Sequence, residues 1–196
     1  MSFVNLVSGG VDSILVGVLG REAGQTVHPL FIDYGQRARQ REWLACTGLH
    51  GRLGLTRPRR VNVTGFGRLV RSGLTDPERN LVSEAFTPGR NALFLLMGAA
   101  YACEVGARAV AIGLIDEPAS IFPDQRTEFL DRIQSAITNA VGRNVAIVAP
   151  LIQMRKAEVL SLAKLYGIKG TYWCHKGGPK ACGRCISCQE RARAKR

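Results

Sequence analysis

The sequence has no long hydrophobic run. Every apolar stretch is shorter than the roughly 18 residues that a membrane-spanning helix needs. The N-terminal segment MSFVNLVSGG also lacks the basic start and the apolar length of a signal peptide. We therefore expect no membrane association and a cytoplasmic location. With 196 residues, 46% of them hydrophobic, the chain is long enough for one packed core and a small appended segment.

Acidic residues are scarce. The chain has 15 Asp and Glu against 27 Lys and Arg, which gives a net charge of +12. Such a charge is typical of nucleic-acid-binding proteins, but a basic surface or a pocket for small anions would produce it too. The arginines are spread over several segments, without the interleaved aromatic residues that stack on bases. Nucleic acid is therefore not the partner that we expect first.

Short apolar segments alternate with helical ones. Strands are expected at residues 3–7, 26–33, 59–63, 107–115 and 145–150. Helices are expected at residues 11–24, 37–54, 91–106, 124–141 and 155–167, the last being the final helix, and residues 64–90 read as a long, partly mobile loop. This alternation predicts an α/β fold with a doubly wound, mostly parallel five-stranded sheet in residues 1–168, followed by a small module in residues 169–196. Ligands of such sheets bind at the carboxyl ends of the strands, which here carry residues 8–13, 33–36 and 113–117.

The first strand is followed by the loop Ser8-Gly9-Gly10-Val11-Asp12-Ser13. It matches neither the Walker A pattern nor the dinucleotide fingerprint G-x-G-x-x-G. Its glycines permit a tight turn and a close approach of backbone to ligand. Amides at the start of the following helix favour an anion, and two serine hydroxyls add donors. The alternative is an ordinary glycine turn in which Asp12 caps the helix.

Four of the six cysteines lie near the C-terminus. Cys174, Cys182, Cys185 and Cys188 are spaced C-x7-C-x2-C-x2-C, which predicts a closed, structural four-thiolate zinc site. An iron–sulfur cluster is a lesser possibility, and His175 is a competing ligand that we expect to be a bystander. Another alternative is a zinc ribbon that binds nucleic acid, with phosphate contacts from Arg184, Arg191 and Arg193. The isolated Cys46 and Cys103 are expected in the core.

The loop resembles the pyrophosphate loop (PP-loop) of the N-type ATP pyrophosphatases. Further segments resemble one branch of that superfamily, the 7-cyano-7-deazaguanine synthases (QueC family): SGGVDS, IDYGQRARQRE (32–42), TPGRNALF (87–94), FPDQRTEF (122–129), PLIQMRKAE (150–158) and CGRCISC (182–188). The resemblance implies an adenine nucleotide alpha hydrolase-like fold and an ATP-dependent C–N ligase. Such an enzyme converts 7-carboxy-7-deazaguanine and ammonia to 7-cyano-7-deazaguanine. The resemblance also implies Mg²⁺ with ATP, a structural Zn²⁺ and a homodimer.

The resemblance also suggests roles for residues of the expected site. Asp12 would bind Mg²⁺ or organise the loop, and catalysis is expected to involve Asp12, Ser13, Arg90 and Lys156. ATP is expected to contact Ser8, Gly9, Gly10, Val11, Asp12, Ser13, Asp33, Gln36, Arg90 and Gly113. Arg90 and Lys156 each open a helix, where a cation suits a phosphate, but each could be a solvated basic side chain. Tyr34 could equally be a packing residue.

The segment IDEPASIFPD (115–124) departs from the family pattern at residues 118–122. Substrate contacts are expected here from Asp116, Glu117, Phe122 and Asp124, although the first two could form a solvated turn and Asp124 could only cap its helix. Because of this departure, the sequence does not decide which acid and which amine are the substrates. A paralogue could stop at the amide or join the acid to another amine, and a tRNA base-modifying enzyme or a non-catalytic zinc module are further alternatives.

Overall fold

A computed structural model describes residues 1–115 and 122–194. Its core is one parallel sheet with the strand order β3-β2-β1-β4-β5. The strands are β1 (Ser2–Val7), β2 (Thr26–Asp33), β3 (Arg59–Asn62), β4 (Ala109–Ala111) and β5 (Ala146–Val148). The predicted doubly wound α/β fold is confirmed. Strand order reverses between β1 and β4, and this switch point is where open parallel sheets bind ligands.

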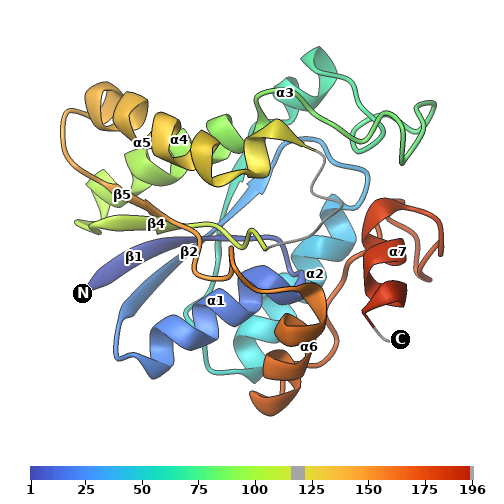
Figure 1. The fold of residues 1–196 in the computed structure, drawn as a ribbon, viewed down its shortest axis with the longest axis horizontal. Coiled ribbons are helices and arrows are strands. Elements are labelled where there is room, and N and C mark those ends of the chain that lie inside the picture. Colours follow the sequence, from blue (N-terminus) through green and yellow to red (C-terminus); the bar gives the residue numbers. More distant parts are fainter. Residues whose placement is uncertain (116–121, 195–196) are drawn as a thin grey trace.

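Helices cover both faces of the sheet (Figure 1). One face carries α1 (Val11–Glu22), α2 (Arg39–Arg52) and α6 (Lys156–Leu165), and the other carries α4 (Arg90–Glu104) and α5 (Thr127–Val141). Among the described residues, no helix is both long and apolar enough to span a bilayer. The carboxyl ends of the strands face the side of the molecule where the C-terminal helix α7 (Ile186–Arg193) lies (Figure 1).

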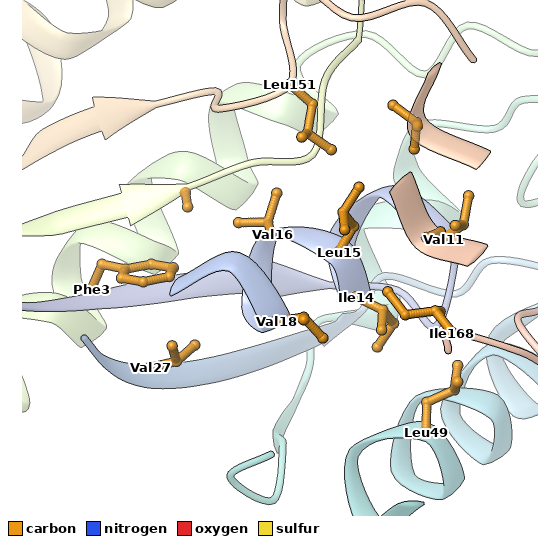
Figure 2. Packing of buried hydrophobic residues seen from close by; sticks show 13 residues of the cluster. Phe3, Val11, Ile14, Leu15, Val16, Val18, Val27, Leu49, Leu151 and Ile168 are labelled. Atoms are coloured by element: carbon orange, nitrogen blue, oxygen red, sulfur yellow. The ribbon is translucent and has the colours of Figure 1, made fainter. Parts of the chain in front are cut away.

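Alternation along β1 divides the core into two clusters. Val4 and Leu6 pack with the α4 and α5 side, whereas Phe3 packs with the α1 side. Figure 2 shows the second group, in which Ile14 and other side chains of α1 gather with Leu49 of α2. Each such side chain, when fully buried, stabilises the fold by roughly 1.5–3 kcal/mol. Because β1 has buried side chains on both faces, among them Asn5, whose side-chain amide donates to the Ser13 carbonyl at 2.9 Å, the strand and the start of the loop that follows it are held firmly.

The expected loop at residues 64–90 begins with the short helix α3 (Thr64–Leu69) and continues without helix or strand to α4. Parts of the loop are packed. Ser72 and Thr87 are buried, and their hydroxyls lie 2.6 Å apart in a hydrogen bond. The amide of Arg37 donates to the carbonyl of Leu74 at 2.8 Å. These bonds satisfy buried polar groups without regular structure.

Other element predictions need correction. Strand β4 covers three of the nine residues expected in it, because the chain beyond Ala111 turns towards the start of α1. The helix expected at 124–141 is divided into the 3-10 turn η1 (Pro123–Gln125) and α5. Helix α6 is not the final helix, because α7 follows it; α7 is short and polar and gives little periodic signal. Cys46 is fully buried as predicted, whereas Cys103 is only partly buried.

Candidate active site

The glycine loop (residues 8–13) joins β1 to α1 at the carboxyl edge of the sheet. The Ser13 hydroxyl accepts a hydrogen bond from the Ser8 amide and donates one to the Gly10 carbonyl, both at 3.2 Å. The Ser8 hydroxyl accepts a bond from the Gly10 amide at 3.3 Å. No side chain of the described chain caps the start of α1. Its first amides, supported by the helix dipole, are therefore suited to an anion.

Close packing requires two of the glycines at this site. Gly9 has a φ of 79°, and a Cβ there would lie 2.5 Å from the carbonyl oxygen of Glu42 and 2.9 Å from the amide nitrogen of Cys46. A Cβ on Gly113 would lie 3.0 Å from the Ser13 amide nitrogen. The loop is thus pressed between α2 and the chain that follows β4, and larger side chains would move it.

An ion pair joins two of the predicted catalytic residues. Nζ of Lys156 lies 2.9 and 2.8 Å from the two carboxylate oxygens of Asp12, although 144 residues separate them in the sequence. Lys156 is the first residue of α6, and Asp12 lies in the first turn of α1. Both side chains are largely buried, so the pair fixes a positive charge beside the loop. The Asp12 carboxylate thus contacts Lys156 beside the loop, and its two expected roles, binding Mg²⁺ or organising the loop, stay predictions.

Two adjoining cavities lie next to the loop. The strand-end cavity has a volume of about 260 Å³ and the C-terminal cavity about 210 Å³. They form one cleft because they share lining residues, namely Ser8, Asp12, Glu42, Leu74, Arg90, Gln125 and His175. The strand-end cavity adds apolar residues from the ends of β1, β2 and β4 and from α4. The C-terminal cavity adds Gly10, Val11, Lys156 and Phe122, and from the C-terminal segment Tyr172, Trp173, Ile186, Ser187, Glu190 and Arg191.

Arg90 lies where the two cavities meet. It opens α4 after Gly89, and its guanidinium carbon lies 6.0 Å from the ring centroids of Tyr34 and Phe94. These two rings contact each other edge to face, with centroids 5.2 Å apart. The aromatic wall suits a planar base, and Arg90 suits a phosphate at its rim.

Glu42 is a residue of the cleft that the sequence analysis did not single out. Its carboxylate accepts a hydrogen bond from Nε2 of Gln36 at 3.0 Å, and Oε1 of Gln36 accepts one from the Tyr34 amide at 3.0 Å. Burial raises the pKa of Glu42 to about 7, although Gln36 and the charge of Arg90 oppose the shift. In the sequence, the signal that could have pointed to Glu42 was its position in the first turn of the helix that follows β2.

Five of the residues expected to bind ligand do not line the cleft or cannot be placed: Gly9, Asp33, Asp116, Glu117 and Asp124. Asp33 lines neither cavity, because its carboxylate pairs with Arg60 at 2.5 Å. Asp124 is buried, and its carbonyl accepts a hydrogen bond from the Asn91 side chain at 3.0 Å; burial raises the pKa of its carboxyl group. Phe122 does line the C-terminal cavity. Asp116 and Glu117 lie outside the described residues.

The four predicted cysteines come together. Their sulfur atoms all lie within 4.8 Å of one another, and His175 is not part of the cluster. Tetrahedral zinc with bonds of about 2.3 Å requires sulfurs spaced at about 3.8 Å, so the group can hold a metal of this size. The Cys182 amide donates to the Cys174 sulfur at 3.3 Å.

The C-terminal segment packs directly against the glycine loop. The Tyr172 amide donates to the Gly9 carbonyl at 3.0 Å. His175 lines both cavities, and burial, assisted by the charges of Arg90 and Lys156, lowers its pKa to about 4. Residues beyond 168 therefore form part of the wall of the cleft.

Comparison with known proteins identifies relatives over almost the whole chain. The family model of queuosine biosynthesis protein QueC matches residues 2–196. A 7-cyano-7-deazaguanine synthase of Synechococcus sp. (strain CC9902) is 34% identical and covers 98% of this chain and 92% of its own. The Campylobacter curvus protein of the same name is 31% identical, covering 97% and 91%.

Solved structures share the fold at low sequence identity. A 4-thiouridine synthetase in complex with RNA and bound ATP superposes with a TM-score of 0.55 at 20% identity, covering 99% of this chain and 49% of its own. The NMN synthetase of Francisella tularensis gives a TM-score of 0.55 at 16% identity, covering 92% and 70%. These likenesses support the fold alone.

Proposed function

The chain belongs to the family of queuosine biosynthesis protein QueC, and from this membership we propose that it is an ATP-dependent 7-cyano-7-deazaguanine synthase. One observation carries the proposal. An uncapped helix start and the Lys156–Asp12 pair lie along a single cleft. Asp12 lines both halves, whereas Gly10, Val11 and Lys156 line the C-terminal half. An anion held at the loop would thus lie in the C-terminal half, next to the strand-end half. One cavity can take the adenosine of ATP and the other can take the acid that is activated.

ATP fits the strand-end half of the cleft. In the proposed complex the adenine lies against Tyr34 and Phe94, and Gly113 borders the same cavity. The phosphates lie at the loop amides and the hydroxyls of Ser8 and Ser13. Arg90 and Lys156 neutralise their charge. The described chain has no cluster of three carboxylates that could hold a cation. Mg²⁺ would therefore be held mainly by phosphate oxygens, and Asp12 and Glu42 are carboxylates that line both halves of the cleft.

The reaction we propose consumes two molecules of ATP. A carboxylate oxygen of 7-carboxy-7-deazaguanine attacks the α-phosphorus, which releases pyrophosphate and makes AMP the leaving group. Ammonia attacks the acyl carbon, AMP leaves, and loss of a proton gives the amide. The amide oxygen attacks the α-phosphorus of a second ATP and pyrophosphate leaves, and loss of AMP and of both protons on the nitrogen gives the nitrile. The cleft contributes by holding the reactants together and stabilising charge on the phosphates.

The four cysteines fit a structural Zn²⁺. Bound there, the ion would have no open coordination position, and it would fix the C-terminal segment as a wall of the cleft. The homodimer implied by the resemblance stays a prediction. A non-catalytic zinc module does not account for the loop, Lys156 and Arg90 lying along one cleft.

Mass spectrometry of the products tests this proposal. The purified protein is incubated with ATP, 7-carboxy-7-deazaguanine and ammonium, and the base and nucleotide products are measured. We expect the nitrile base, with two AMP formed per nitrile. Accumulation of the amide alone would identify a paralogue that stops early. An absence of AMP with this acid would overturn the assignment of substrate.

A further inference from the structure

Arg191 is a charged residue in the lining of the C-terminal cavity. We propose that its guanidinium binds the carboxylate of the acceptor acid, so that helix α7 belongs to the substrate site as well as to the cysteine module. The inference rests on the proposed function, because it assigns a substrate group to one half of the same cleft.

The structure presents Arg191 to the cavity in a fixed orientation. Its guanidinium carbon lies 3.9 Å from the ring centroid of Trp173, and both residues line the C-terminal cavity. Stacking on an indole holds the guanidinium plane and leaves its edge available for two parallel hydrogen bonds. Within the described chain, its buried Nε has no hydrogen-bond partner. A planar two-oxygen acceptor matches this edge.

Three cations and three carboxylates line the C-terminal cavity, namely Arg90, Lys156 and Arg191 beside Asp12, Glu42 and Glu190. Burial lowers the pKa of Arg191, which shows that its charge is partly desolvated, and the charge of Asp12 offsets part of this effect. However, Asp12 is already engaged by Lys156 through both of its oxygens. A desolvated cation gains more from an incoming carboxylate than a solvated cation does.

A carboxylate suits this position better than a phosphate of ATP. The phosphates have the loop amides, Lys156 and Arg90 around them. In an in-line displacement the attacking oxygen approaches the α-phosphorus from the side opposite the leaving pyrophosphate. The C-terminal cavity is bordered by Gly10 and Val11 of the loop and by Lys156, so an acid held by Arg191 would lie next to phosphates bound at these residues.

The neighbouring arginines do not share this arrangement. Arg184 and Arg193 are exposed, and neither lines the C-terminal cavity. Of the three arginines that the sequence offered as contacts for nucleic-acid phosphates, only Arg191 turns into the cleft. Arg193 is therefore a matched control on the same helix.

Calorimetric binding to the zinc-loaded full chain tests the inference. The titrants are 7-carboxy-7-deazaguanine, its neutral 7-carboxamide and a non-hydrolysable ATP analogue, and the proteins are wild type, R191Q and R193Q. We expect R191Q to weaken binding of the acid by about ten- to a hundredfold. Its affinity for the amide and for the ATP analogue should stay within about twofold of wild type, and R193Q should match wild type throughout.

Unchanged acid affinity in R191Q would overturn the inference, as would an equal loss of acid and ATP affinity, which would place the guanidinium on a phosphate. If R191Q loses zinc or unfolds, R191K decides. R191K keeps the positive charge but lacks the planar guanidinium group. It should bind the acid severalfold more weakly than wild type and bind the amide equally well. If R191K binds the acid as tightly as wild type, the proposal is refuted. Failure of the proposed function looks different, because wild-type protein would then neither bind nor convert this acid.

Discussion

Replacing Asp12 with alanine removes the partner that holds Lys156 beside the glycine loop. In the native site, Nζ of Lys156 contacts both oxygens of Asp12, and the exposed fractions of the two side chains are 8% and 24%. Without the carboxylate, the ammonium group loses these two contacts, which hold it where it can neutralise phosphate. We therefore expect D12A to fold but to lose ATP-to-AMP turnover.

The burial of the pair sets the size of the effect. Breaking a fully buried ion pair costs about 3–5 kcal/mol, whereas an exposed pair contributes less than about 1 kcal/mol. Because the Asp12 side chain is 24% exposed, the pair lies between these two limits. We therefore expect the free energy of unfolding to fall by about 2 kcal/mol. For a chain of this size, this corresponds to a Tm lower by about 4–8 °C. Removal of one charge-stabilising group lowers turnover about a hundredfold or more.

The assay compares AMP formation and thermal melting in D12A, D12N, K156M and D12A/K156M. D12N keeps the shape and one acceptor oxygen, so it should melt above D12A and still lose activity. If Asp12 acts through Lys156, the double variant should be little slower than K156M alone, because residues in contact are not additive. Wild-type AMP formation in D12A, or strictly additive losses in the double variant, would refute the reasoning.

Two further predictions concern the metal and the pH. Elemental analysis should find one zinc per chain, and its removal by a chelator should loosen residues 172–193 and abolish AMP formation; a metal-free preparation that is fully stable and active would contradict this. Because the folded-state pKa of Glu42 is raised to about 7 from 4.5, its effect on stability is absent below about pH 4.5 and destabilising above pH 7. E42Q should therefore gain about 1–2 kcal/mol over wild type in urea unfolding at pH 8 and much less at pH 5, and an equal difference at both pH values would show that Glu42 does not titrate as described.

Much of the fold could be predicted because local signals agreed with the tertiary structure. The segment TVHPLFID forms β2 with the expected bounds, since an apolar run between a glycine and a polar turn has few alternatives. The cysteine spacing likewise identified the cluster, because ligands two residues apart can reach one ion. In both cases the residues that decide the structure are neighbours in the chain.

Features that depend on distant contacts were not accessible from sequence. The burial of Glu42 arises where α2 meets the glycine loop, and no periodicity in the helix reports it. Asp33 looked like a ligand at a strand end, but its pairing with Arg60 of β3 draws it away from the cleft. Helix α7 is short and polar, and only the fold reveals that Arg191 stacks on Trp173.

The two halves of the cleft also differ in where their residues come from. The half assigned to ATP is built from β1, β2 and the start of α4, which the core holds in place. The half assigned to the acid includes the glycine loop, Arg90 and Lys156, and to these it adds Phe122 and side chains from residues 172–191, beyond the last strand of the sheet. Phe122 stacks on Phe86, with ring centroids 5.2 Å apart, so even this departure from the family pattern has a packed place in the wall. Changes there can alter the acid or the amine without disturbing activation by ATP, which is why the identity of the acid has to be tested separately from AMP formation.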